Sequence, residues 1–292
     1  MKNRIMLRVA LSIGCAAGLS FALQGGQAQA PPAAQPPQSA SPVQKQPQIK
    51  SPDETQAVMA MIRAQDPDSR IKAAEELLNK FADSEFKPVA LQFIAASYQQ
   101  KNDFPNMAVY AERALQADPK NYMAMLMLAG GIAQRTREFD LDREEKLAKA
   151  EKYAKDAMEI LKTAPRPNPQ ITDEQWEAAK KDFNAQAYEA LGLGEMARKN
   201  YTGAIEQFKK SLQFAGSQES ATMVRLGAAY NRVGQYDNAI SILDEVMKSP
   251  TVHPQIRQFA QAEKARAVQA KGGAGNAPAA PAAPQVEIKK QP

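Results

Sequence analysis

The sequence has few of the residues that build metal, disulfide and nucleophilic sites. It holds one Cys, one His and one Trp in 292 residues. A single His cannot form the usual zinc sites or complete a Ser–His–Asp arrangement, because each needs further ligands or partners. His253 stands directly before Pro254, where a turn is expected. We therefore expect no catalytic residue, no metal site, no cofactor and no enzymatic activity.

Glycine-rich phosphate loops and calcium loops are also missing. The runs at 25–26 and 272–275 follow no expected strand and lack the Gly-Lys-Ser/Thr ending of a phosphate loop. The acidic segment from Asp140 to Glu144 lacks the turn glycine and the twelfth-position Glu of a calcium loop. We interpret that segment as a solvated helix start.

The first thirty residues have the layout of a secretory signal peptide. Lys2, Arg4 and Arg8 form a basic start, Val9–Leu23 is mostly apolar, and small residues follow at 28–30. The apolar stretch is shorter than the ~20 residues that a membrane span needs. We expect cleavage near Ala30 and a periplasmic or otherwise extracytoplasmic protein, with an uncleaved anchor as the alternative.

Removal of this segment changes the charge and the thiol content of the chain. It carries three basic and no acidic residues, so the formal net charge falls from +5 to +2. A nearly neutral protein is a poor candidate for nucleic-acid binding, which depends on clustered Lys and Arg. Cys15 is also removed, so disulfides are not expected. Lipidation of Cys15 is an alternative, although Ser12 stands where a Leu is typical.

Composition divides the rest of the chain into three parts. Residues 31–52 are rich in Pro, Gln and Ala, and residues 271–292 are rich in Ala and Pro. Such segments bury too little apolar surface to offset their ordering entropy, so we expect a disordered linker and a disordered tail. Helical periodicity fills 53–270, and its clearest break is the proline-rich Thr163–Gln170.

A pattern repeats with a period of 35 residues near the C-terminal end of this helical part. The matched positions are Leu191–Gly192 with Leu226–Gly227, Tyr201 with Tyr236, Ala204–Ile205 with Ala239–Ile240, Phe208 with Leu243, and Leu212 with Met247. Small residues let two helices approach closely, and large ones fill the space between successive pairs. A period in the mid-thirties indicates stacked helix–turn–helix units.

At these residues the chain resembles the tetratricopeptide repeat (TPR) family. The resemblance implies an all-α, right-handed helix–turn–helix solenoid of about eleven helices, with a degenerate N-terminal pair and a C-terminal capping helix. The expected pairs lie near 53–82, 88–118, 121–163, 173–215 and 219–249, and the capping helix at 253–270. The second-helix signature of the third pair comes nine residues late, so we expect an insert around Thr136–Glu145.

The resemblance also implies a function. First helices of TPR units line a concave groove, and the candidate groove residues are Gln92, Gln99, Met123, Leu126, Gln134, Glu189, Asn231 and Arg232. We expect an exported, non-enzymatic scaffold or adaptor that binds a partner protein or an extended peptide there. The alternatives are docking through the convex edges, or an envelope-tethered structural or assembly factor, held through its Pro/Gln-rich arm or by a lipid on Cys15.

Overall fold

The computed structural model describes residues 42–216 and 219–272. The expected signal peptide, Cys15 and the tail beyond residue 272 lie outside these ranges. The described residues form helices and one isolated β-bridge. The helices are α1 (Pro52–Arg63), α2 (Pro67–Lys80), α3 (Lys87–Gln100), α4 (Phe104–Ala117), α5 (Tyr122–Arg135), α6 (Arg143–Thr163), α7 (Asp173–Ala197), α8 (Tyr201–Phe214), α9 (Ser220–Arg232), α10 (Tyr236–Lys248) and α11 (Pro254–Gly272).

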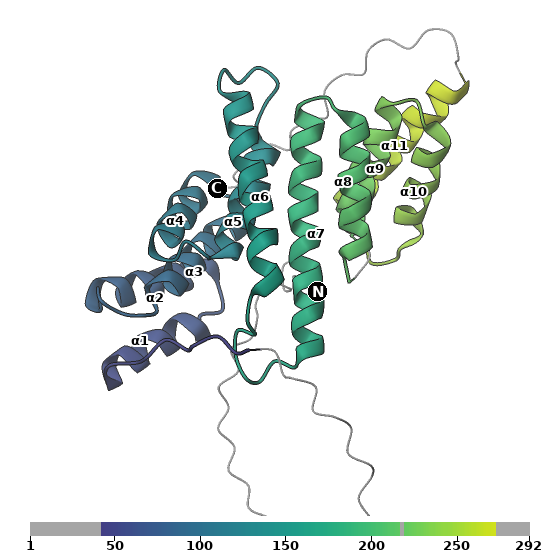
Figure 1. Ribbon diagram of the computed structural model, residues 1–292. Coiled ribbons are helices and arrows are strands. Elements are labelled where there is room, and N and C mark those ends of the chain that lie inside the picture. The colour runs from purple at the N-terminus through teal and green to yellow at the C-terminus, as the bar shows by residue number, and fades with distance from the viewer. Residues whose placement is uncertain (1–41, 217–218, 273–292) are drawn as a thin grey trace, which may run out of the picture.

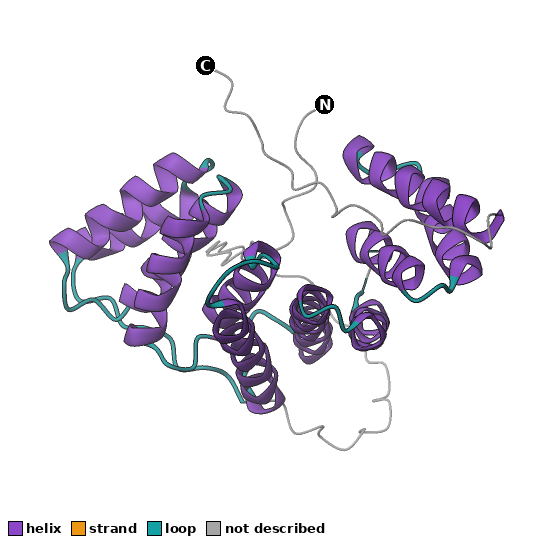
Figure 2. Ribbon diagram, turned by 90° about the horizontal axis from the view of Figure 1, so that it is seen from above, coloured by secondary structure: helices purple, strands orange, loops and turns teal. Residues whose placement is uncertain are grey.

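The helices stack in chain order as antiparallel pairs (Figure 1). Each odd-numbered helix from α1 to α9 packs against the even-numbered helix that follows it, and α5 also packs against α7. The last helix, α11, covers both α9 and α10. Seen from above, the pairs follow one another along a curved path (Figure 2). The all-α array of TPR-like pairs, its degenerate first pair α1–α2 and its closing helix agree with the sequence prediction.

Side-chain caps fix where several helices begin. Thr172 Oγ1 accepts the amide of Gln175 at 3.2 Å, and Gln175 Oε1 accepts the amide of Thr172 at 3.0 Å. This reciprocal pair satisfies two amide donors that a helix start leaves free, so α7 begins where Thr172 predicts. Asp66 and Asn200 cap α2 and α8 more simply. Each side chain accepts one hydrogen bond, from the amide of the third helical residue.

Small residues on one helix accommodate large ones on its partner. A Cβ atom placed on Gly227 would lie 2.8 Å from the side chain of Leu243, and one on Gly192 would lie 2.5 Å from the ring of Phe208. Leu243 and Phe208 are fully buried. The 35-residue pattern therefore marks the closest contact inside two successive pairs, α7–α8 and α9–α10.

The third pair departs from the others, as the expected insert predicts. Turns of three residues join the helices of the other four pairs, whereas residues 136–142 join α5 to α6. In addition, α6 has 21 residues, compared with 14 in α4 and α8. Figure 1 shows the long α6 rising with this loop at its upper end.

Residues 42–51 correct one expectation. We expected them to belong to a disordered linker, but they run extended along the inter-pair loops. The Arg166 amide donates to Pro42 O at 2.9 Å, and the Gln44 amide donates to Arg166 O at 2.8 Å. At the other end, Lys50 Nζ lies 2.6 Å from Asp83 Oδ2. The prolines of this segment lack an amide donor but do not prevent these bonds. Pro42 takes part through its carbonyl oxygen, and Gln44 supplies the backbone amide.

No helix among the described residues combines the length and apolarity that crossing a bilayer requires.

Candidate protein-binding groove

A pocket of about 210 Å³ lies on the face formed by the first helices of successive pairs. Its floor is apolar, with Leu126 from α5 and Ala190 and Leu193 from α7. Amide side chains surround the floor, namely Gln99, Asn102, Gln134 and Gln186. We call this cavity the groove pocket. An apolar floor with amides around it suits a peptide segment, because the amides can pair with peptide N–H and C=O groups while an apolar side chain enters the floor.

Four of the eight candidate groove residues line this pocket. Gln99, Leu126, Gln134 and Glu189 come from three different helices and share one cavity. Leu126 is only 7% exposed, so it contributes mainly the floor. Sequence positions more than thirty residues apart therefore meet because the pairs stack in register.

The other four candidates lie elsewhere. Gln92 Nε2 donates to the sulfur of Met123 at 3.1 Å, so these two contact each other outside the pocket. Asn231 Nδ2 donates to the backbone oxygen of Glu263 on α11 at 2.9 Å, and the Arg232 guanidinium lies 5.7 Å from the centre of the Tyr201 ring. In the last unit the closing helix α11 covers the place where a groove would continue.

The groove pocket has one more positive than negative side chain. Glu189 Oε1 accepts Thr222 Oγ1 at 3.0 Å and pairs with the guanidinium of Arg225, so that pair is neutral overall. Arg135 lies 5.1 Å from the centre of the Phe104 ring and donates to Asn102 O at 3.3 Å. Among the residues that the structure describes, Arg135 makes no ion pair. The pocket thus presents one uncompensated positive charge.

Two adjacent glycines give the pocket its depth. A Cβ atom on Gly130 would meet no atom within 4 Å, because Gly130 faces the open cavity. A Cβ atom on Gly131 would lie 2.6 Å from the Phe104 ring, because Gly131 faces the neighbouring pair. Gly131 is therefore needed for packing, whereas Gly130 leaves space that any side chain would fill.

Sequence reasoning missed Asn102, Arg135 and Arg225. They stand outside the inward positions that the repeat assigns, and the two arginines reach the pocket through long side chains. A signal for Arg225 was present, because Glu189 carries the opposite charge 36 residues earlier, about one repeat period. No such charge pattern points to Arg135, because it contacts the Phe104 ring and the Asn102 carbonyl rather than a carboxylate.

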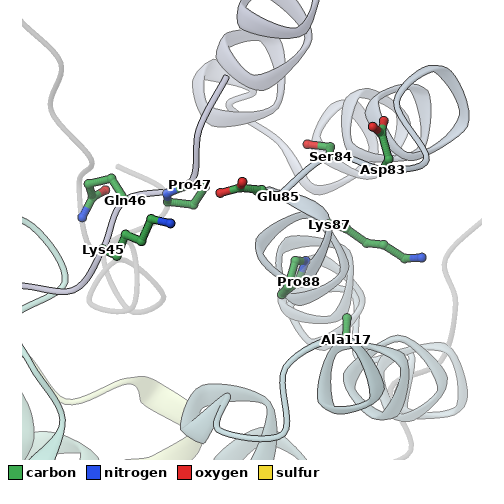
Figure 3. A pocket seen from close by; sticks show the side chains of 9 residues that line it. All are labelled: Lys45, Gln46, Pro47, Asp83, Ser84, Glu85, Lys87, Pro88 and Ala117. Carbon is green, nitrogen blue, oxygen red and sulfur yellow. The ribbon is translucent and has the colours of Figure 1, made fainter. Parts of the chain in front are cut away.

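A larger space of about 600 Å³ lies between residues 42–51 and the α2–α3 turn. Figure 3 shows Lys45, Gln46 and Pro47 on one side and Asp83, Ser84 and Glu85 on the other. Its carboxylates already have partners: Asp83 pairs with Lys50, and Glu85 Oε2 accepts the amide of Gln48 at 3.0 Å. We therefore interpret it as solvent space beside the extended segment.

The described residues contain no group of three or more His, Cys, Asp or Glu side chains placed to hold a metal ion.

Solved structures that are similar to this chain include a tetratricopeptide repeat protein and other proteins. TTC0263 of Thermus thermophilus, a thermophilic TPR protein, is 16% identical; the match covers 72% of this chain and 94% of that one, with a TM-score of 0.49. The stacked helix pairs of this chain are tetratricopeptide-like. A MamA double mutant is 16% identical over 70% of this chain and 92% of that one (TM-score 0.39). Acl4, an assembly chaperone of RpL4, is 11% identical over 77% and 97% (TM-score 0.41).

No family model and no curated protein matches the chain. The TPR-like assignment therefore describes the architecture, and the role of the protein has to be argued from its own groove.

Proposed function

We propose that this protein is an exported, non-enzymatic scaffold that binds an extended segment of a partner protein in its concave groove. The observation that carries the proposal is the groove pocket, in which Gln99, Leu126 and Gln134 line one cavity of mixed polar and apolar character. Stacked helices hold these side chains at fixed positions, so little ordering entropy is lost on this side when a peptide binds.

The chemistry of the pocket suggests the kind of segment it takes. The floor accepts one apolar side chain, and the surrounding amides pair with the peptide backbone on either side of it. Arg135 adds one positive charge, which favours a segment with an acidic residue near the apolar one.

Selection of random peptides displayed on phage against the purified chain tests this proposal. The enriched peptides are then titrated by calorimetry against the variant Gln99→Glu/Gln134→Glu, whose two changes lie on exposed side chains of the pocket and repel an acidic segment. The matched control is Gln100→Glu/Gln116→Glu, which makes the same exchange at exposed positions outside it. We expect the groove variant to lose about tenfold or more in affinity and the control to keep it.

Equal losses in the groove variant and the control would place the binding surface elsewhere. Failure to enrich any peptide would contradict the proposal. Export is tested separately, by intact mass of the chain in the extracytoplasmic fraction. A chain that begins just after Ala30 supports export with cleavage, and one carrying a lipid on Cys15 supports the tethered alternative.

A further inference from the structure

The loop between α5 and α6 carries the two most exposed large apolar side chains of the described residues. Phe139 is 88% exposed and Leu141 is fully exposed. The loop, residues 136–142, has no counterpart in the other pairs, which turn in three residues. We call it the knob loop. Paired apolar side chains that project into solvent mark an interaction surface more often than scattered single ones do.

The knob loop is held in one shape by polar contacts. The carboxylate of Asp140 accepts the amide of Arg137 at 3.2 Å and the ammonium of Lys146 at 3.0 Å. The amide of Arg143 donates to Asp140 O at 3.1 Å, and Glu138 pairs with Lys199 at the α7–α8 turn. The side chains of Phe139 and Leu141 are therefore presented in advance, which lowers the entropy that binding would cost.

The groove pocket matches the knob in size and in charge. Its volume is about 210 Å³, and an apolar cavity of about 150 Å³ already binds benzene, so a phenylalanine ring fits. Residues 137–146 contain five acidic and three basic side chains. Glu138 pairs with Lys199, and Asp140 and Asp142 both pair with Lys146, so the negative excess of the knob is small. The pocket has the opposite excess, because Arg135 has no carboxylate partner among the described residues.

The knob loop does not occupy the groove pocket of its own chain. Phe139 is almost fully exposed although Arg135, which lines the pocket, precedes the knob loop directly. Knob and pocket therefore lie side by side on one molecule. In such an arrangement a two-fold axis between two copies can place each knob in the other copy's pocket, and both contacts form at once in a closed dimer.

We propose that this protein self-associates by such a reciprocal exchange, with Phe139 of each copy in the groove pocket of the other. The exchange uses the pocket whether or not a peptide of another protein binds there, and it goes beyond the proposed function. Where both occur, self-association and peptide binding compete, so the dimer holds the groove closed until a partner displaces the knob.

Sedimentation velocity of the full chain over a wide concentration range tests the exchange. The knob variant is Phe139→Ser/Leu141→Ser, and the pocket variant is Gly130→Met, whose new side chain meets open space. The control is Val109→Ser/Val268→Ser, which removes two other exposed apolar side chains. We expect the wild type and the control to dimerise with rising concentration, and both other variants to associate about tenfold or more weakly.

Complementation gives the sharpest outcome. A mixture of the knob variant and the pocket variant keeps one intact knob and one intact pocket, so it forms a 1:1 complex at concentrations at which each variant alone is monomeric. A wild type that is monomeric at every concentration, a knob variant that dimerises normally, or a mixture without a complex would each overturn the proposal. Binding of monomeric wild type to neutral phosphatidylcholine vesicles, lost in the knob variant, would also overturn it by assigning the knob to lipid.

The two proposals fail separately. The knob variant keeps an unaltered pocket, so it retains peptide binding while losing self-association. Loss of peptide binding by the Gln99→Glu/Gln134→Glu variant says nothing about whether wild-type copies dimerise.

Discussion

Gly192 on α7 lies directly against the ring of Phe208 on α8, so closely that a methyl group on Gly192 would come within 2.5 Å of the ring. Phe208 is fully buried, so the ring cannot move aside without displacing its neighbours in the core. The pair is one of the contacts that the 35-residue repeat records, and it sets how closely the two helices approach.

The first prediction compares two glycines of the same helix. Gly192→Ala should lower the free energy of unfolding by about 1–3 kcal/mol, because the methyl group overpacks the helix interface. Gly194→Ala should raise it by about 0.5–1 kcal/mol, since its Cβ meets only Arg198 Nη1 at 4.0 Å and alanine favours the helix. Urea unfolding followed by circular dichroism measures both, and equal effects at the two sites would show that Phe208 does not set the helix spacing.

Much of the fold could be predicted from such pairs. Leu226, Gly227 and Leu243 are apolar or small because α9–α10 buries the same contacts as α7–α8, so the pattern repeats along the sequence. The groove is different. Its members are polar, and the contacts of Gln99 and Gln134 depend on how far neighbouring pairs are rotated, which no local pattern records. Position in the repeat therefore predicted which helix faces inward but not which side chains share a cavity.

Asn231 shows why the candidate residues of the last unit fell outside the pocket. The repeat places it on the concave face, and the structure places α11 over that face, where Asn231 Nδ2 also donates to Glu263 Oε2 at 3.0 Å. The closing helix was predicted, but its effect on the last inward positions requires knowing its direction across α9. The extended segment 42–51 was missed for a related reason: its hydrogen bonds use backbone groups, which composition does not reveal.

The second prediction concerns this contact between Asn231 and α11. Asn231→Ala should lower the free energy of unfolding by about 1–2 kcal/mol, because the change removes hydrogen bonds to the backbone oxygen and the carboxylate of Glu263. Amide hydrogens of α11 should exchange faster. Asn238→Ala serves as the control, since its side chain is exposed and bonds only Gln235. Unchanged exchange in α11 would mean that apolar packing alone holds that helix.

The third prediction is a pH dependence of the knob loop. The Arg137 amide and the Lys146 ammonium lower the pKa of Asp140 below its usual value of 3.8. A carboxylate with a lowered pKa stabilises the folded loop above its unfolded pKa, and this contribution is lost as the pH falls through the folded pKa. The loop should therefore stay ordered at neutral pH and loosen only in acid below about pH 4.

Hydrogen exchange at Arg137 and Arg143 measures this loosening, after correction for the intrinsic effect of pH on exchange. The variant Asp140→Asn should show fast exchange of both amides already at neutral pH. Asp156→Asn, which removes an exposed carboxylate paired with Lys152 on α6, should leave them protected. An Asp140→Asn loop as protected as the wild type would show that the backbone turn alone holds it.

The last prediction separates the extended segment 42–51 from the core. A chain that begins at Lys50 should lose about 1–3 kcal/mol in its free energy of unfolding, because it gives up exposed hydrogen bonds and the partial burial of two apolar side chains. Val43 and Ile49 are 39% and 45% exposed, so a little over half of each is buried in the full chain. The local effect should be larger: the Arg166 amide loses its acceptor, Pro42 O, and should exchange faster, whereas the Ile171 amide in the same loop bonds Asn168 and should not change. A loss of several kcal/mol would instead make this segment part of the cooperative core, and unchanged exchange at Arg166 would show that the segment does not hold the α6–α7 loop in solution.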